Sequence, residues 1–287
     1  MINQEQQPLT PVVTDDGLGS QAYQRLRNNQ DFGSGFPALL SKEVMRFWRV
    51  AIQTILAPVL TSVLYLLVFS HVLEGRVQSY PGSSVAIDYV SFLIPGLIMM
   101  SMQQNAFANA SSSLVQSRIT GNLVFILLPP MSAYELYGAY VLGGIVRGLM
   151  VGICLWLFAM LFRVVLPYNI LWVLVFAVLA CGIMSTLGLI AGLWSEKFDQ
   201  LALFQNFLIM PASFLSGVFY SIHSLPPFWQ AVSQWNPIFY MIDGMRYGFF
   251  GVADTSPWIS LAVVGGVFVI ISLIALRLIV SGYKLRN

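Results

Sequence analysis

The sequence contains few charged residues. Only 9% of its 287 residues are Asp, Glu, Lys or Arg, whereas soluble domains contain about 25%. Hydrophobic residues make up 57% of the chain, and its mean hydropathy is +0.75. This composition excludes a water-soluble globular domain and indicates an integral membrane protein. The net charge of +2 says little, because in a membrane protein the positions of the charges matter more than their sum.

Residues for covalent or metal chemistry are also scarce. The two cysteines, Cys154 and Cys181, lie in apolar runs without a CxxC or Cys/His spacing, which favours small core residues over a disulfide or metal site. Ser216 and His223 resemble a nucleophile and a base, but no second motif supports them. The motif GxxxxGKS/T is absent, so the chain has no phosphate-binding loop of that kind. We therefore expect a chain without catalytic residues, metal or bound cofactor.

The first part of the chain divides into two segments. Residues 1–35 are polar and Gly-rich without helical periodicity, which predicts a disordered tail, and they lack the features of a secretory signal. In residues 36–49, Phe36, Leu40 and Val44 recur at helical spacing, and basic residues occupy other faces. This pattern predicts an amphipathic helix in the membrane interface. The alternative is that these residues are the first turns of the helix that follows.

Six apolar stretches are long enough to cross a bilayer as helices, which requires about 20 residues each. They cover residues 50–72, 92–114, 136–162, 171–194, 201–220 and 258–280. The sequence therefore predicts an all-α integral membrane protein with six transmembrane helices. If the N-terminus is cytoplasmic, ten Lys and Arg residues flank the spans inside and three, Arg76, Arg163 and Arg246, lie outside. This asymmetry predicts that both termini are cytoplasmic.

Small residues and one charge stand out within these spans. Glycine recurs every fourth residue at Gly144, Gly148 and Gly152, and again at Gly188 and Gly192. This spacing allows helices to approach closely, and we expect packing within the chain rather than between two copies. Arg147 lies near the middle of its span, where an Arg costs roughly 2.5–3.5 kcal/mol on insertion scales. Either it contacts an anionic substrate or a partner carboxylate, or it is a structural charge satisfied by nearby carbonyls.

The segment before the last span is apolar but repeatedly interrupted. It reads SIHSLPPFWQAVSQWNPIFYMIDGMRYGFFG over residues 221–251 and is rich in Phe, Trp and Tyr. Pro226, Pro227 and Pro237 prevent it from forming one straight helix. Irregular backbone at membrane depth is tolerated only where protein or water covers it.

The order of these parts resembles the permease subunit of ABC-2 type exporters of the bacterial inner membrane. The stretches FLIPGLIMMSM, GAYVLGGIVRG and WSEKFDQ and the interrupted segment carry the resemblance, which extends from about Leu39 to the C-terminus. It implies that residues 36–287 form one transmembrane domain, that two copies assemble with two copies of a separate ABC ATPase, and that this ATPase binds ATP and Mg²⁺. The expected substrate is a hydrophobic or amphiphilic molecule moved outward, and no nucleic-acid partner is expected.

The resemblance also assigns the interrupted segment to a re-entrant hairpin at residues 225–250 on the outer side. Pro226 and Pro227 would open a first helix, and Asn236 and Pro237 would form the turn to a second. Aromatic rings such as Trp229, Trp235, Phe239 and Tyr240 would lie at the membrane interface, and Asp243 could pair with Arg246 on one helix face. The alternative is an interfacial loop without a gating role. The expected hairpin and gate residues are Pro226, Pro227, Trp229, Trp235, Asn236, Pro237, Asp243, Arg246 and Tyr247.

The resemblance further places a coupling helix in VQSRITGNLVFILLPPMSAYE, after the second span. Many family members carry several charged residues before the Gly of this link, whereas this chain has only Arg118 before Gly121. We therefore expect contacts with the ATPase to depend on the apolar residues that follow. The expected coupling residues are Arg118, Gly121, Asn122, Leu123, Phe125 and Ile126.

Two other functions remain as alternatives. An ion-coupled carrier or channel would be expected to have carboxylates inside the membrane, and none lies clearly within the middle of a predicted span. A membrane scaffold without transport would not stimulate an ATPase.

Overall fold

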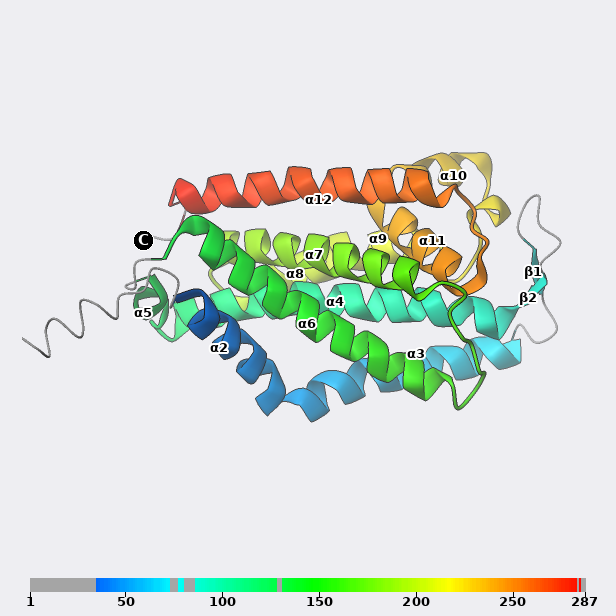
Figure 1. Ribbon diagram of the computed structural model, residues 1–287, viewed down its shortest axis with the longest axis horizontal. Coiled ribbons are helices and arrows are strands. Elements are labelled where there is room, and N and C mark those ends of the chain that lie inside the picture. The colour runs from blue at the N-terminus through cyan, green and yellow to red at the C-terminus, as the bar shows by residue number, and fades with distance from the viewer. Residues whose placement is uncertain (1–34, 73–76, 80–85, 128–130, 283, 285–287) are drawn as a thin grey trace, which may run out of the picture.

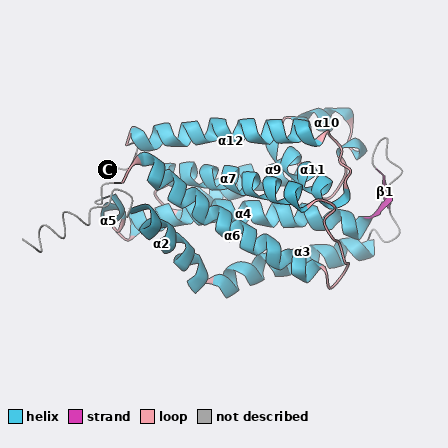
Figure 2. Cartoon of the chain, viewed as in Figure 1, coloured by secondary structure: helices cyan, strands magenta, loops and turns pink. Residues whose placement is uncertain are grey.

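Most of the described chain is helical (Figures 1 and 2). The computed structural model describes residues 35–72, 77–79, 86–127, 131–282 and 284, so the predicted disordered tail lies outside the described residues except for Gly35. The helices are α2 (Gly35–Arg49), α3 (Ala51–Val72), α4 (Tyr89–Ile119), α5 (Leu123–Leu127), α6 (Ala133–Ala159), α7 (Ile170–Trp194), α8 (Phe198–Leu203), the π-helix η1 (Phe204–Ile209), α9 (Met210–Phe214), the 3₁₀ turn η2 (Ile222–Ser224), α10 (Pro227–Gln234), α11 (Pro237–Phe250) and α12 (Pro257–Val280). Strands β1 (Val77–Ser79) and β2 (Ala86–Asp88) form a small antiparallel ribbon.

The all-helical class predicted from the sequence is confirmed. Within the described residues, four helices are long and apolar enough to cross a membrane: Ala51–Phe69 of α3, then α6, α7 and α12. They correspond to the first, third, fourth and sixth predicted spans. The second predicted span lies in α4, whose Ser, Gln and Asn residues dilute its apolar ones. The fifth is divided among α8, η1 and α9, so the total of six spans stays a prediction.

Helix α4 is the centre of the bundle. It contacts α3, α6, α7, α8 and α11, and Figure 1 shows it running the length of the molecule beneath α7. A Cβ added at Gly148 of α6 would lie 3.0 Å from the Met102 carbonyl oxygen of α4 and 2.6 Å from Cys181 Sγ of α7. One at Gly188 of α7 would overlap the Phe107 carbonyl of α4. The predicted use of these glycines for packing within the chain is confirmed.

The helix ends carry recognisable signals. Ser132 caps α6, because its Oγ accepts from the Glu135 amide at 3.2 Å while Glu135 Oε2 accepts from the Ser132 amide at 2.7 Å. Asn169 caps α7 through its side-chain oxygen. Helix α11 ends at Gly251, whose φ of 71° is in the left-handed region that glycine adopts at little cost. These signals fix where the chain turns between helices.

Helix α2 is separate from α3, because the chain breaks helical geometry at Val50. One face of α2 is buried through Leu39, Glu43 and Phe47, and this face packs mainly on α6. Trp48 on another face is exposed. The sequence correctly predicts an amphipathic helix here, whose location in the membrane interface stays a prediction.

Candidate functional site

A groove follows one side of α4. Its first part is a cavity of about 360 Å³ between α4 and the α8–η1 segment, where Gln104, Asn105 and Ser112 face Gln205. Its second part is a cavity of about 270 Å³ among α3, α4 and α9. Gln104 lines both cavities, so they adjoin along α4. The groove offers hydrogen-bonding groups beside apolar walls, which suits a molecule with both polar and apolar parts.

The polar residues on α4 are partly satisfied by their own helix. Ser112 Oγ donates to the Ala108 carbonyl at 2.5 Å and Ser111 Oγ to the Phe107 carbonyl at 2.8 Å. These bonds use the hydroxyl hydrogens and leave oxygen lone pairs available. The α4 wall of the groove therefore accepts hydrogen bonds as well as donating them through Gln104, whose Nε2 lies 3.9 Å from Met210 Sδ.

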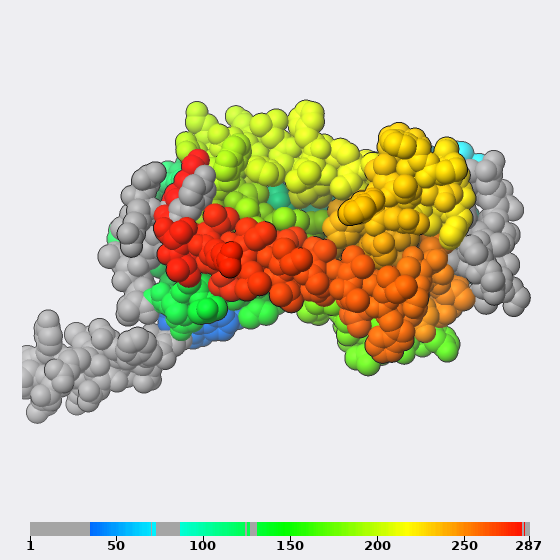
Figure 3. All heavy atoms as spheres, turned by 90° about the horizontal axis from the view of Figure 1, so that it is seen from above, coloured from blue at the N-terminus to red at the C-terminus, as the bar shows by residue number. Residues whose placement is uncertain are grey.

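The opposite wall contains the π-helix η1. Residues 198–214 pass through α8, η1 and α9 without a break in the chain, and contacts of α8 with α4 are sparse. Phe207 and Leu208 of η1 are exposed. Figure 3 shows this yellow-green segment along one edge of the molecule. A π-helix is rare and often marks a functional position within a helix, and a weakly packed wall can move with little loss of contact.

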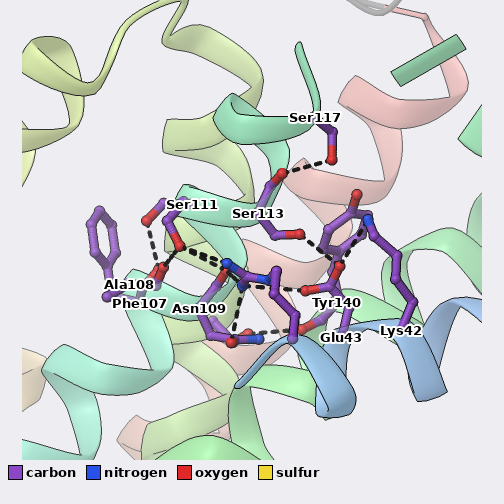
Figure 4. A network of polar contacts seen from close by, with 12 residues as sticks. Lys42, Glu43, Phe107, Ala108, Asn109, Ser111, Ser113, Ser117 and Tyr140 are labelled. Atoms are coloured by element: carbon purple, nitrogen blue, oxygen red, sulfur yellow. Dashed lines mark hydrogen bonds and ion pairs between the residues drawn. The ribbon is translucent and has the colours of Figure 1, made fainter. Parts of the chain in front are cut away.

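Glu43 fixes α2 to the bundle. Its side chain is fully buried, and its carboxylate oxygens lie 3.3 Å from Lys42 Nζ and 3.4 Å from Arg46 Nη2. Ser113 Oγ of α4 donates to Glu43 Oε1 at 2.6 Å. Figure 4 shows Glu43 pointing from α2 toward Ser113 and lying beside Tyr140 of α6. A buried carboxylate is stable only when paired and hydrogen-bonded in this way, so the network determines how α2 is placed against α4 and α6.

The predicted hairpin forms two short helices. Helix α10 begins after Pro226, with Pro227 as its first residue, and Pro237 opens α11. At the turn, Asn236 Oδ1 accepts from the Ile238 amide at 3.0 Å, and Asn236 Nδ2 donates to the Ala212 carbonyl at 2.6 Å. The turn is thereby tied to α9. The proposal that the hairpin is re-entrant in the membrane stays a prediction.

Its aromatic residues divide between surface and core. Trp235 is 90% exposed and Trp229 is partly exposed, whereas Phe239 is buried and Tyr240 half-buried. Tyr247 packs edge-to-face on Trp172 of α7, with 5.6 Å between ring centroids. Helix α11 is thus a core element that contacts α4, α7 and α12, and the placement of these aromatic rings at the membrane interface stays a prediction.

The predicted pairing of Asp243 with Arg246 is wrong. Among the described residues, no ion pair joins Asp243 and Arg246. Both side chains are buried, and each binds the backbone of a different loop. Asp243 accepts from the amides of Asp254 and Thr255 at 2.7 and 2.9 Å. Arg246 Nη2 donates to the carbonyls of Gly217 at 2.7 Å and of Val218 at 3.0 Å. Helix α11 therefore joins the chain leaving α9 to the chain entering α12.

The predicted coupling residues lie together at the opposite end of the molecule. Phe125 of α5 is 69% exposed, whereas Leu123 is 8% exposed and Ile126 is half-buried against Leu39 and its neighbours. Gly121 and Asn122 are exposed just before α5, and Gly121 has a φ of 71°. Phe125 is therefore the most accessible of the three apolar residues and Leu123 is buried against the chain, and their contact with an ATPase stays a prediction.

Arg118 is a structural residue of this end. Its guanidinium donates to the carbonyls of Ser195, of Leu193 at 3.2 Å and of Lys284 at 2.9 Å. These bonds tie the end of α4 to the loop after α7 and to the chain after α12. Arg147, in contrast, has one hydrogen-bond partner among the described residues, Asn105.

The groove and the Glu43 network were not predicted from the sequence. The signal for the groove was the run of polar residues in α4, which includes Gln103, Gln104, Asn105 and Asn109 within an otherwise apolar span. The signal for the network was a lone acidic residue on the apolar face of a basic helix, since Glu43 is four residues from both Leu39 and Phe47.

Comparisons with known proteins agree with this architecture. Residues 34–250 match the model of the ABC-2 type transporter family. Three curated relatives, from Escherichia coli K12, Escherichia coli O157:H7 and Shigella flexneri, carry the name inner membrane transport permease YadH. Each is 37% identical over 250 residues, which cover 87% of this chain and 96% of the relative. The chain therefore belongs to the ABC-2 type transporter family.

Proposed function

We propose that this chain is the membrane-spanning permease of an ABC exporter in the bacterial inner membrane. A separate ABC ATPase binds ATP and Mg²⁺ and hydrolyses the nucleotide, and two copies of each subunit form the transporter. The substrate is a hydrophobic or amphiphilic molecule that moves outward. The family match supports a permease that works with an ABC ATPase, and the name of the relatives supports a transport permease of the inner membrane.

The groove along α4 carries this proposal. Gln104, Asn105 and Ser112 line a cavity, and hydrocarbon in this cavity would leave their remaining donor and acceptor sites unsatisfied. A second copy placed over the groove would cover these groups and convert two open grooves into one enclosed path. In this proposal the polar residues of α4 serve the substrate, and the same groove supports the proposed homodimer.

Helix α4 also connects the groove to the proposed ATPase surface. It is one helix of 31 residues, about 45 Å long at 1.5 Å per residue. Its C-terminal end carries Arg118. Three residues separate its last residue, Ile119, from α5, which carries the exposed Phe125. A displacement of α5 by the ATPase would therefore reach the groove wall through a single rigid element.

The membrane arrangement completes the proposal. Both termini are cytoplasmic, and α4 and the α8–η1–α9 segment cross the membrane in addition to the four apolar helices. Helices α10 and α11 enter and leave the outer leaflet and close the outer end of the path. The ties from Asn236 to α9 and from Arg246 to the chain after α9 support this placement, because they attach the hairpin to the movable wall.

Reconstitution tests the proposal. The tagged permease would be purified with its ATPase, its subunit ratio measured by native mass spectrometry, and inside-out vesicles supplied with fluorescent amphiphiles of negative, neutral and positive head group. We expect a two-to-two complex and ATP-dependent accumulation of at least one amphiphile. The control is an ATPase whose phosphate-loop Lys is replaced by Ala, which should accumulate none. Accumulation that is equal without ATP would contradict the proposal and favour an ATP-independent carrier.

A further inference from the structure

Arg147 is a charged side chain whose hydrogen bonds are incomplete. It lies near the middle of α6, and its Nη2 donates to Asn105 Oδ1 of α4 at 3.1 Å. Its Nε is buried without a hydrogen-bond partner in the structure. The Phe47 ring centroid of α2 lies 5.9 Å from the guanidinium carbon. An aromatic ring and one amide oxygen engage only part of a group with five N–H donors.

Two other arginines, Arg118 and Arg246, have more hydrogen-bond partners than Arg147. Arg118 donates to three backbone carbonyls. Arg246 donates to two and lies 3.7 Å from the Phe92 ring centroid. For Arg147, the part of the chain that the structure describes provides no carbonyl bond and no carboxylate within 4 Å. Carbonyls therefore do not account for this charge.

The nearest acidic network does not neutralise Arg147 either. Glu43 is already shared between Lys42 and Arg46 and accepts from Ser113. Arg46 in turn donates to the Asn109 carbonyl at 2.7 Å and to Ser112 Oγ at 3.2 Å. Lys42, Arg46 and Arg147 thus lie near a single carboxylate, which only Lys42 and Arg46 contact, so the region keeps an excess of positive charge.

This positive charge lies behind the wall of the groove. Asn105, which holds Arg147, and Ser112, which accepts from Arg46, both line the cavity of about 360 Å³. The same cavity has apolar walls formed by Phe107, Ala108 and Leu201. No Asp, Glu, Lys or Arg is among its described lining residues. The groove therefore presents donors backed by two guanidinium groups beside a surface suited to a hydrocarbon chain.

We propose that Arg147, together with Asn105 and Arg46, binds the negatively charged head group of an amphiphile whose apolar part lies in the groove. The inference rests on the proposed function, in which the groove is the transport path. A guanidinium attracts phosphate and carboxylate groups, and the positive charge of Arg147 and Arg46 reaches the cavity through Asn105 and Ser112, which lie between them and the cavity. The anionic head group belongs either to a phospholipid of the bilayer or to a separate amphiphile.

Binding to the full-length permease, purified without its ATPase in a neutral maltoside detergent, tests the proposal. The probes are fluorescent dodecyl phosphate and the fluorescent dodecanol of the same chain length, with affinity read by anisotropy. The wild type should bind the phosphate probe at least tenfold more tightly. Arg147→Gln should reduce this ratio to near one, and Arg147→Lys should retain part of it. Arg163→Gln, at an exposed arginine, is the matched control and should leave the ratio unchanged.

Asn105→Asp tests the same anion site through a second residue. It places a carboxylate beside the guanidinium of Arg147, so the ratio should fall although the arginine remains. Displacement of the phosphate probe by phosphatidylglycerol would identify a bilayer phospholipid as the source of the head group, and lack of displacement would identify a separate amphiphile. Equal affinity for both probes in the wild type, or an unchanged ratio in both Arg147→Gln and Asn105→Asp, would overturn the proposal.

The binding measurements test the anion site, and the transport measurements test the exporter, so the two proposals can fail independently. ATP-driven transport of neutral probes without a preference for phosphate would reject the anion site alone. A phosphate preference that depends on Arg147, in a protein without ATP-driven transport, would reject the exporter and leave the anion site.

Discussion

Asp243 and Arg246 are three residues apart on α11, yet each binds the backbone of a different loop. Asp243 accepts hydrogen bonds from the amides of Asp254 and Thr255, and Arg246 donates to the carbonyls of Gly217 and Val218. One helical turn thus attaches α11 both to the chain after α9 and to the chain before α12. This double attachment requires an accepting side chain and a donating side chain, because one loop presents amide donors and the other presents carbonyl acceptors.

Replacement of Arg246 should therefore destabilise the fold. Arg246→Ala leaves two buried carbonyls without donors and removes the contact with Phe92, and we expect a loss of roughly 2–4 kcal/mol. Arg246→Lys should lose less, since an ammonium keeps the charge but not the planar fork. Thermal unfolding in detergent measures both. Arg163→Ala, at an exposed arginine, is the control, and an Arg246→Ala protein that unfolds at the same temperature would contradict the assignment.

The glycines of α6 give a matched test of helix packing. Gly148→Val places methyl groups against Cys181 and the Met102 carbonyl, and overpacking of this kind costs typically ~1–3 kcal/mol. Gly265→Val in α12 makes the same chemical change where a Cβ would meet nothing within 4 Å. We expect a lower unfolding temperature for Gly148→Val only. Equal effects would show that helix propensity, rather than contact with α4, decides the outcome.

The ion pairs of Glu43 and Glu196 should contribute differently to the stability of the fold. Glu43→Ala removes the buried carboxylate that accepts from Ser113 and pairs with Lys42 and Arg46, and because both cations are partly exposed we expect a loss of about 1–3 kcal/mol. Glu196 pairs with Lys284 at 3.1 Å, but its side chain is largely exposed, so Glu196→Ala should change stability by ~0–1 kcal/mol. Limited proteolysis between α2 and α3 provides a local readout. Unchanged cleavage in Glu43→Ala would show that the network does not hold α2.

Single cysteines at Ser224 and Ser256 test the proposed hairpin. Both side chains are exposed and flank α10 and α11, so an impermeant thiol reagent should label both in intact cells. Asn287→Cys should react only after the membrane is opened, as the asymmetry of Lys and Arg predicts. The background is a chain with Cys154 and Cys181 replaced by Ala. Labelling at only one of the two flanking positions would mean that the segment crosses the membrane.

The helical elements were largely predictable because long apolar runs have few alternatives in a membrane. The ranges 171–194 and 258–280 differ from α7 and α12 by one residue at a single end. The break of the fifth span into α8, η1 and α9 was not predictable, since Phe204 to Ile209 carry no residue that requires a π-helix. Its local geometry depends on packing that one sequence does not reveal.

The candidate site was less predictable than the helices. Proline and asparagine correctly marked the hairpin turn, because Pro fixes φ and Asn caps a helix. The roles of Asp243, Arg118 and Glu43 depended on the distant partners Asp254, Ser195 and Ser113, which are 11, 77 and 70 residues away. Sequence spacing predicts local pairs such as Asp243 with Arg246, and the structure favoured the distant ones.

Phe125 provides the most direct test of the central claim that a separate ATPase moves this permease through α5. Its exposed ring has no cover within the described chain, and a buried aromatic anchor at an interface is commonly worth ~2 kcal/mol or more. The measurement is ATP-driven accumulation of amphiphile in inside-out vesicles containing Phe125→Asp, with Tyr168→Asp at an exposed position near α11 as the matched control. The account predicts normal membrane insertion together with loss of the ATPase or hydrolysis without transport. A Phe125→Asp protein that keeps its ATPase and transports at the wild-type rate would contradict it.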